Sequence, residues 1–425
     1  MLIENARWVD ARGQIQVGTI RIEGDRIRLG ASATPAAPHE RVLDGTGAWV
    51  LPGLVDAHTH LREPGQAYKE GITNGSRAAL KGGVTTLLDM PNNVPPITSP
   101  ARLAAKRALF QRNCRTHWGV HVQAPVEEPQ ALGPHAAAKL YMAKSSELPA
   151  VRDLDSITRI LSQHRRVAVH AEDESCFLPR ASFPGGRSHH LERPVAAVRA
   201  ALETLETALE RLPESRRPRL VLCHATTAAE VAWLKRMKAS GFDVWGETCP
   251  HYLLFTDEDY VREGQCLKVN PPLRSRSDRE AIRQAIAEGV LDFVSSDHAP
   301  HAPREKADEA NAPSGIPGIE WMAPALLHLV DTGILDWPRL IQVSSTNACR
   351  CYDLRSWGGI ADGALADLIL VSRNTDTAPP VTLAGHAPYA ALGFAWRVDT
   401  TLLRGSVAFE GGRFDDETHG EEVTA

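Results

Sequence analysis

The most regular feature of the sequence is an alternation of short apolar runs with longer segments of helical periodicity. Eight runs of strand length lie in the middle of the chain, at residues 49–60, 84–90, 116–122, 138–142, 166–172, 219–225, 243–249 and 292–300. Helical patterns separate them, as at residues 74–83, 101–113 and 194–212. This order predicts a parallel sheet with helices outside it.

Eight strand–helix units predict an α/β fold in which residues 51–350 close into a (β/α)8 TIM barrel. A doubly wound open sheet is the alternative, because strands are difficult to count from one sequence.

The two ends of the chain follow a different pattern. Residues 1–30 alternate apolar and polar side chains, with turn-forming residues at 10–13 and 23–25, and residues 366–372 and 401–414 look similar. We therefore expect a small β-sandwich domain formed by both termini, from residues 1–50 and 351–425. The acidic residues 415–425 are expected to be frayed.

Composition narrows the class of protein. The net charge of −5 indicates no general attraction to nucleic acid or an anionic membrane. No apolar run approaches the ~20 residues that span a bilayer, and the first residues lack the pattern of a signal peptide. Seven cysteines without a C-x-x-C pair do not indicate a zinc ribbon. We expect a cytoplasmic protein that acts on a small molecule.

Polar residues stand near the C-terminal ends of the apolar runs, where TIM barrels carry their working face. His58 and His60 end the first run, and residues two apart on a strand point the same way. Alone, this pair is weak evidence for a metal site, because a chain with 17 histidines contains about one such spacing by chance. Later runs repeat the pattern with Lys139, His170, His224 and Asp297.

Four imidazoles, one carboxylate and one lysine would thus meet at one mouth. Imidazole and carboxylate suit zinc and similar divalent ions, and six groups fit two metals better than one. Lys139 is unusual, because an ammonium cannot bind a cation. A lysine carboxylated by carbon dioxide could bridge two metals; the alternative is a structural lysine with its amine at the barrel rim.

The remaining histidines give weaker signals. We assign no role to His117 or His121, and we expect His189 and His190 to face water in a loop. His251 could line the site or simply pack.

Several motifs resemble those of the cyclic amidohydrolases, and most of all the dihydroorotases. The similar segments are "DAHTHLREPG", "SSDHAPH", "PSGIPGIE", "VNPPLR" and the stretch from "KEGITNG" to "MPNNVPP". The resemblance covers nearly the whole chain. It implies two Zn²⁺ ions, or other divalent metals, held by His58, His60, carboxylated Lys139, His170, His224 and Asp297.

The resemblance also suggests how a substrate would bind. Arg62, Asn92 and His301 match positions that hold the substrate carboxylate in dihydroorotases, and a guanidinium suits a carboxylate through paired hydrogen bonds. A surface ion pair with Glu63 or Glu70 is the alternative for Arg62. Two features do not favour the dihydroorotases. The segment "GETCPHYLL" resembles allantoinases and hydantoinases as much as dihydroorotases, and Ser145 and Ser146 stand where a Thr-Phe pair is expected.

These features predict reversible hydrolysis of dihydroorotate to N-carbamoyl-aspartate, as in pyrimidine biosynthesis, with Asp297 moving the proton. An allantoinase or hydantoinase-type activity is one alternative. Another is a non-catalytic partner of aspartate transcarbamoylase, which the complete ligand set argues against. Family resemblance makes a homodimer plausible.

Overall fold

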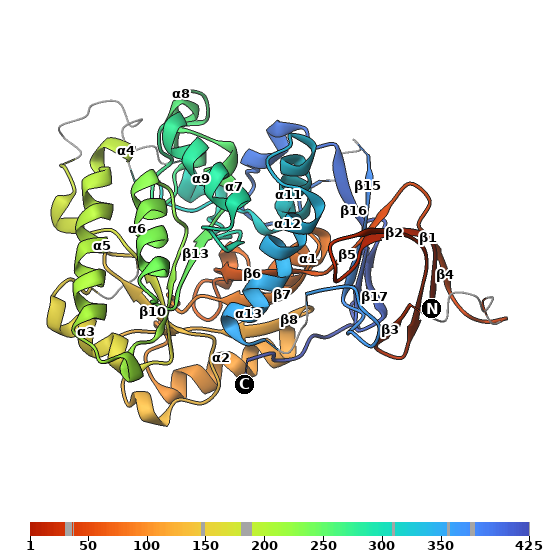
Figure 1. Ribbon diagram of the computed structural model, residues 1–425, viewed down its shortest axis with the longest axis horizontal. Helices are drawn as coiled ribbons and strands as arrows, with labels where there is room; N and C mark the ends of the chain where they lie inside the picture. Colours follow the sequence, from red (N-terminus) through yellow and green to blue (C-terminus); the bar gives the residue numbers. More distant parts are fainter. Residues whose placement is uncertain are drawn as a thin grey trace.

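The computed structural model describes residues 1–29, 36, 38–145, 149–179, 189–307, 311–354, 358–374 and 379–424. Its centre is a ring of parallel strands surrounded by helices, and a sheet built from both ends of the chain lies against one side (Figure 1).

The ring follows the order in which its strands occur along the chain. Its members are β6 (Leu54–Thr59), β7 (Val84–Asp89), β8 (His117–Val120), β9 (Val122–Gln123), β10 (Ala138–Tyr141), β11 (Arg166–His170), β12 (Arg219–Leu222), β13 (Val244–Thr248) and β14 (Phe293–Val294). His121 separates β8 from β9. The ring closes where Thr59 bridges His298 and His60 N donates to His298 O at 2.8 Å. The predicted TIM barrel is confirmed, and the open sheet is not formed.

Helices cover the outside of the ring. They are α1 (Ile72–Lys81), α2 (Pro100–Asn113), α3 (Leu154–Gln163), α4 (His189–Glu192), α5 (Val195–Glu210), α6 (Ala228–Ala239), α7 (Pro250–Leu254), α8 (Tyr260–Glu263), α9 (Arg276–Glu288), α10 (Pro303–Lys306), α11 (Met322–Asp331), α12 (Trp337–Ile341) and α13 (Asn347–Tyr352). A π-helical turn, η9 (Gln342–Thr346), joins α12 to α13. Side-chain caps define several starts: Ser99 accepts from Arg102 N at α2, and Thr227 and Glu230 form a capping box at α6.

Short 3₁₀ turns lie in the connections. They are η1 (Ala67–Lys69), η2 (Pro129–Ala131), η3 (Glu174–Cys176), η5 (Glu214–Arg216), η6 (Asp257–Asp259), η7 (Gly264–Leu267), η8 (Ile319–Trp321) and η10 (Pro388–Leu392). Of these, η1 follows the first strand of the barrel and places Lys69 beside the mouth.

A fully buried lysine ties two barrel strands together at the mouth end. Lys106 on α2 donates to Met90 O at 2.6 Å and Asn93 Oδ1 at 2.9 Å, and pairs with Asp89 Oδ2 at 2.7 Å. The other oxygen of Asp89 accepts from Leu61 N at 2.7 Å. This network fixes the ends of β6 and β7 relative to each other.

The terminal sheet joins strands from opposite ends of the chain. They are β1 (Leu2–Val9), β2 (Ile15–Glu23), β3 (Arg26–Arg28), β4 (Val42–Asp44), β5 (Trp49–Pro52), β15 (Leu368–Arg373), β16 (Trp396–Leu403), β17 (Ser406–Glu410) and β18 (Arg413–Phe414). Strand β5 pairs with β1 on one side and β15 on the other. The small β domain from both termini is thus confirmed; its limits at residues 50 and 351 remain a prediction.

The prediction that the acidic C-terminal tail is frayed is wrong, because the tail is hydrogen-bonded to the barrel. Trp118 N donates to Glu421 O, and Val423 N donates to Trp118 O, so the tail adds to the edge of β8. Glu422 forms a bidentate ion pair with Arg107, and Val423 is buried in the barrel floor. Two further acidic residues of the tail, Asp416 and Glu421, pair with Arg77 and Arg404.

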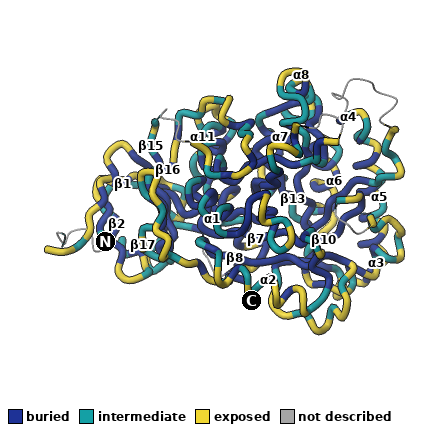
Figure 2. Tube along the Cα trace, turned by 180° about the vertical axis from the view of Figure 1, so that it is seen from behind, coloured by how far each residue is buried: buried dark blue, intermediate teal, exposed yellow. Residues whose placement is uncertain are grey.

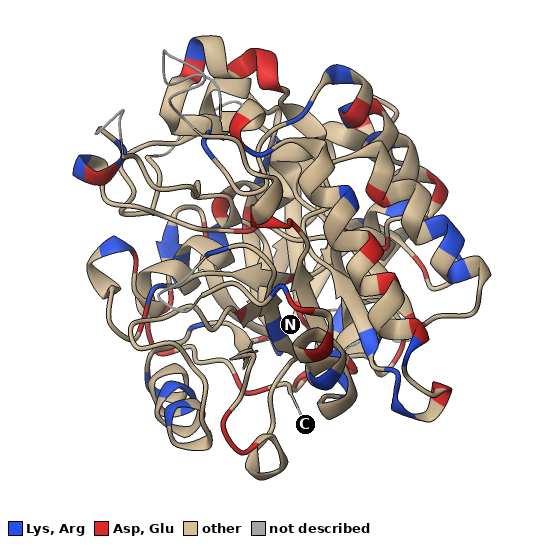
Figure 3. Ribbon diagram, turned by 90° about the vertical axis from the view of Figure 1, so that its left-hand side faces the viewer, with Lys and Arg blue, Asp and Glu red and all other residues tan. Residues whose placement is uncertain are grey.

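Burial and charge follow this layered plan. Figure 2 shows buried segments around β7, β10 and β13, with exposed segments on the outer helices and at the sheet's far edge. Figure 3 shows Lys and Arg interspersed with Asp and Glu along the outer helices. Among the described residues, no helix is both long and apolar enough to cross a membrane.

Candidate active site

Six buried side chains, here called the mouth cluster, meet at the C-terminal ends of the barrel strands. They are His58 and His60 on and just after β6, Lys139 on β10, His170 ending β11, His224 after β12 and Asp297 after β14. All except Lys139 line a cavity of about 240 Å³. The structure therefore brings together every side chain that the sequence pattern selected as a metal ligand.

The ligand atoms of the mouth cluster face one another. Asp297 Oδ1 lies 3.2 Å from His60 Nε2 and 3.4 Å from His58 Nε2. On the other side, His170 Nδ1 lies 3.1 Å from His224 Nε2. Two imidazole nitrogens this close together can bind the same metal ion, so the arrangement suits metal binding.

Outer hydrogen bonds fix which ring nitrogen faces inward. Glu247 Oε1 lies 2.7 Å from His58 Nδ1, Asn92 Oδ1 lies 2.6 Å from His60 Nδ1, and Glu172 Oε2 lies 2.9 Å from His170 Nε2. Each oxygen accepts the ring N–H, which leaves the opposite nitrogen as a lone-pair donor. Metal-binding histidines are commonly oriented in this way.

Glu172 is itself held by two buried cations. Arg193 forms a two-point ion pair with it, and Arg274 approaches its other oxygen at 3.4 Å. Arg193 and His170 lower the pKa of this carboxyl against the effect of burial, so Glu172 is ionised and accepts from His170.

Three residues around the mouth have left-handed backbone conformations. The φ angles are +66° at Arg62, +40° at His224 and +45° at Asp297. Such conformations cost roughly 1–3 kcal/mol each for residues other than glycine, and they concentrate at functional sites. Here they turn side chains that follow β6, β12 and β14 toward one cavity.

The surroundings of Lys139 show whether these residues are suited to hold metal ions. Its side chain is fully buried, and Nζ makes no hydrogen bond with any described residue. Burial, and next the charge of Lys139, hold the pKa of His58 well below its usual range, and burial raises the pKa of the Cys223 thiol to about 12. Burial raises the pKa of the nearby Glu247 carboxyl and the charge of Lys139 opposes this shift, but no carboxylate among the described residues lies at ion-pair distance from this nitrogen. The histidines and Asp297 form a donor set that fits a divalent metal centre.

Arg62 and His301 form one wall of the cavity. Arg62 Nε donates to Pro300 O at 3.1 Å, and its Nη2 lies 3.1 Å from His301 Nε2. Within the described chain, no carboxylate lies at ion-pair distance from this buried guanidinium. The expected alternative of a pair with Glu63 or Glu70 is not formed, because Glu63 caps Ile72 N and Glu70 binds Thr382.

Asn92 occupies the His60 side of the cavity. Its Oδ1 accepts from His60, so its Nδ2 is directed away and donates to Ser145 O at 3.3 Å. Ser145 lines the cavity, whereas Ser146 lies outside the described residues.

Several lining residues were not singled out from the sequence. Asn270, Ser314, Gly315 and Tyr141 face the cavity. Asn270 Oδ1 accepts from Ser314 Oγ at 3.0 Å and from His189 Nε2 at 2.8 Å. Asn270 lies in "VNPPLR", a motif that pointed to the family without indicating a role.

The remaining histidines are structural. His189 is buried in α4, so the prediction that it faces water is wrong, and His190 is half-buried. His251 does not line the cavity; its Nδ1 lies 3.0 Å from Tyr389 Oη. His121 lies 3.3 Å from Ala57 O, and His117 Nδ1 accepts from Glu421 N.

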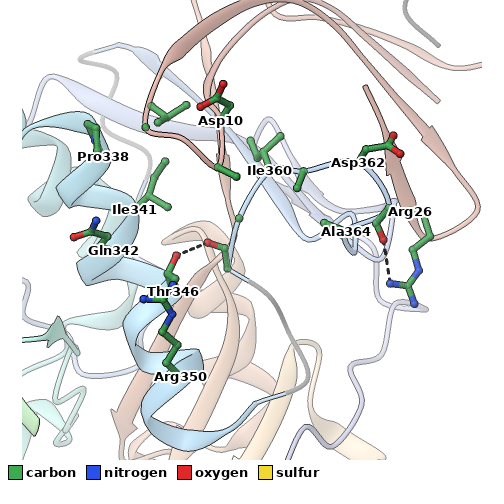
Figure 4. Close-up of a pocket in the computed structure, with 17 residues that line it drawn as sticks. Asp10, Arg26, Pro338, Ile341, Gln342, Thr346, Arg350, Ile360, Asp362 and Ala364 are labelled. Carbon is green, nitrogen blue, oxygen red and sulfur yellow. Dashed lines mark hydrogen bonds between the residues drawn. The ribbon is translucent and has the colours of Figure 1, made fainter. Parts of the chain in front are cut away.

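A second cavity, of about 490 Å³, lies between the β1–β2 turn, η9 and residues 358–364 (Figure 4). Its polar groups are largely used within the fold: Thr346 Oγ1 donates to Gly358 O, and Arg26 donates to Gly363 O. The described side chains around it include no group of ligands close enough to hold a metal. The chemistry therefore points to the smaller cavity.

Comparisons with known proteins agree with this geometry. The sequence profile of the amidohydrolase family matches residues 49–408. The chain belongs to the amidohydrolase family. It is therefore a hydrolase, as the motifs predicted.

Individual relatives of this amidohydrolase cover its whole length. A dihydroorotase of Staphylococcus aureus (strain Mu50 / ATCC 700699) is 30% identical over 429 residues, covering 97% of this chain and 100% of the relative. A dihydroorotase of Anaeromyxobacter dehalogenans (strain 2CP-C) is 32% identical over 438 residues, covering 98% and 99%. The structure of L-hydantoinase (dihydropyrimidinase) from Arthrobacter aurescens superposes with a TM-score of 0.91 at 22% identity, covering 100% and 99%, which shows the shared fold.

Proposed function

We propose that this amidohydrolase is a dihydroorotase, which reversibly hydrolyses the ring amide of dihydroorotate to N-carbamoyl-L-aspartate. The observation that carries the proposal is the Arg62 guanidinium, which is buried at the cavity wall without a carboxylate partner in the described chain. A buried charge calls for a counter-charge, and the ring carboxylate of dihydroorotate supplies one. The dihydroorotase relatives support this assignment.

The mouth cluster would hold two divalent metal ions, which we propose to be zinc. His58, His60, Asp297, His170, His224 and carboxylated Lys139 would hold them. When bound, such ions polarise a carbonyl oxygen and lower the pKa of water.

Asp297 would carry the proton. Its Oδ1 faces the inward nitrogens of His58 and His60 at the cavity floor. In hydrolysis, Asp297 accepts a proton from the attacking water and delivers it to the ring nitrogen as the C–N bond breaks. In ring closure it takes the proton from the carbamoyl nitrogen and passes it to the hydroxyl of the protonated side-chain carboxyl group of the substrate, which leaves as water as the C–N bond forms.

Arg62, His301 and Asn92 would fix the ring by its carboxylate. Asn92 keeps one Nδ2 hydrogen for a ligand, because Ser145 O takes only the other. A ring held at this wall presents its amide bond toward the mouth cluster, and such positioning contributes strongly to rate.

The test compares substrates with and without that carboxylate. In Arg62→Asn, kcat/KM for dihydroorotate should fall roughly a hundredfold or more, since truncating one member of a buried charge pair costs ~2–5 kcal/mol. Metal content should stay the same, and any hydrolysis of uncharged dihydrouracil should change far less. Equal losses on both rings would show that Arg62 supports the fold instead of the substrate.

An allantoinase or hydantoinase-type activity is the alternative, because "GETCPHYLL" resembles those enzymes as much as it resembles dihydroorotases. Turnover of allantoin or hydantoin above that of dihydroorotate by the zinc-loaded protein would favour it. A chain that purifies without metal and turns over none of these rings would instead indicate a non-catalytic partner. We also propose that the protein is a cytoplasmic homodimer. Sedimentation at micromolar concentration can test whether the dimer forms.

A further inference from the structure

His301 has neighbours that make opposite demands on one ring nitrogen. Its Nε2 lies 3.1 Å from Arg62 Nη2, which can only donate, and 3.0 Å from Ser314 O, which can only accept. A neutral imidazole carries one proton, and these two contacts alone do not determine where it resides.

Lys69 resolves this ambiguity. Its Nζ lies 3.2 Å from His301 Nδ1 and 3.1 Å from Glu305 Oε1, and the side chain is buried. An ammonium donates and never accepts, so the nitrogen facing it must be a lone pair. The ring proton then resides on Nε2, directed to the Ser314 carbonyl at the cavity wall.

We propose that Lys69 is a positioning residue that holds His301 in the neutral Nε2–H form, so that this proton, which Ser314 O accepts in the free protein, can be shared with the substrate carboxylate when it binds. The donation to substrate rests on the proposed function; the tautomer rests on the contacts alone.

The charges around His301 agree with a neutral ring. Burial, followed by Arg62, Lys69 and Lys306, holds the pKa of His301 far below its usual range. Among the described residues, Glu305 is the carboxylate at its side, with Oε2 3.7 Å from Nδ1, and it is already paired with Lys69. Without Lys69, Glu305 would face the ring directly and favour protonation or the Nδ1–H tautomer.

The tautomer can be observed without any substrate. Nitrogen NMR of histidine-labelled protein should show His301, assigned by loss of its signals in His301→Gln, as Nε2–H throughout pH 6–8. In Lys69→Met the ring should become a mixture of the two neutral tautomers, because burial and Arg62 still disfavour its protonation. Lys69→Arg, which keeps a donor, should restore the wild-type pattern. An Nδ1–H ring in the wild type, or identical spectra in wild type and Lys69→Met, would overturn the proposal.

Kinetics give a second, independent measurement. Lys69→Met should raise KM for dihydroorotate about tenfold above pH 7, the loss expected for one hydrogen bond, with kcat less affected. The increase should be similar throughout pH 7–8, because burial and Arg62 keep the ring neutral in both proteins. Lys306 has its pKa lowered to about 7 by burial, but it is present in both proteins and its titration cancels.

A double-mutant cycle separates this role from a direct effect of charge. In a His301→Gln background the side chain has no tautomer to set, so adding Lys69→Met should change KM less than about twofold. A full tenfold increase there would show that Lys69 acts on the substrate by its own charge and would overturn the positioning role. Lys81→Met removes another ion-paired lysine, 2.6 Å from Glu320, and serves as the matched control. If the wild type fails to hydrolyse dihydroorotate, the proposed function falls, and the spectra still decide the tautomer.

Discussion

Two fully buried lysines in this barrel have opposite environments. Lys106 on α2 has two oxygen acceptors and an ion-pair partner, Asp89, within 2.9 Å. Lys139 on β10 has no oxygen acceptor at hydrogen-bond distance in the described chain, and histidines, the Cys223 thiol, the Glu247 carboxyl and the ring of Tyr141 lie around it. One is a completed structural contact, and the other is a group whose partner the polypeptide does not provide.

The comparison shows how a buried charge that stabilises the fold differs from one that is kept for function. A buried ion pair is strongly destabilising to break, because the surviving charge loses its partner. A buried charge without a partner has no such role in stability and persists because something else binds it. The two lysines should therefore respond in opposite ways to the same kind of substitution.

The largest effect is expected for Lys139→Ala. We expect loss of bound metal and a fall in kcat/KM of roughly 10⁴-fold or more, since metal assistance provides several kcal/mol. Metal per chain, measured by mass spectrometry, and turnover check this. Short carboxylic acids should restore part of the activity by filling the gap. Retained metal with lost stability would mean that Lys139 is structural like Lys106.

Asp297→Asn should come next, with a loss of ~10²–10⁴-fold in both directions of the reaction, because an amide cannot relay the proton. Metal content must be measured in the same samples, since Asp297 also faces His58 and His60. The midpoint of unfolding should change little. Undiminished turnover with both metals bound would remove Asp297 from the proton path.

Lys106→Met should act on stability. We expect a loss of ~3–5 kcal/mol in the free energy of unfolding, because Asp89 is left buried and unpaired. Metal per folded chain should stay unchanged. The double variant Asp89→Asn/Lys106→Met removes both charges and should recover much of the loss. Urea unfolding of the three proteins measures this, and a double variant weaker than the single one would contradict the pairing argument.

The smallest effect concerns alkaline pH. Burial lowers the pKa of Lys106 below its usual 10.5, although Asp89 opposes the shift. The folded state therefore loses this proton at a lower pH than the unfolded state does. Between the folded pKa and 10.5, wild-type stability should rise relative to the double variant and then level off. A difference in unfolding free energy that stays flat from pH 8 to 10.5 would show that Lys106 titrates normally.

Much of the barrel and its mouth could be predicted from the sequence. His58, Lys139 and His170 lie in apolar runs, and strand geometry alone places the ends of such runs at one rim. The residues that orient them could not be found this way. Glu247 reaches His58 from a strand 189 residues further along the chain, and nothing near either residue shows that contact.

The errors of prediction have the same origin. The tail is rich in acidic residues, and only the folded structure brings Arg107 to Glu422. His189 stands beside polar residues in the sequence, yet Val269 O and Asn270 accept its hydrogen bonds across the fold. Local composition predicts exposure correctly only when no distant partner exists.

The docked tail also sets an order of events during synthesis. Glu422 closes onto Arg107 across 315 residues, and at ~5–20 residues per second translation needs roughly 15–60 s to cover that distance. Throughout this interval the nascent chain carries β8 without the strand-like neighbour that finally covers its edge. Strand β5 lacks its neighbour β15 for a similar time. The barrel is therefore completed only after the docked tail has been synthesised, and the half-made chain is the stage at which it most needs protection from aggregation.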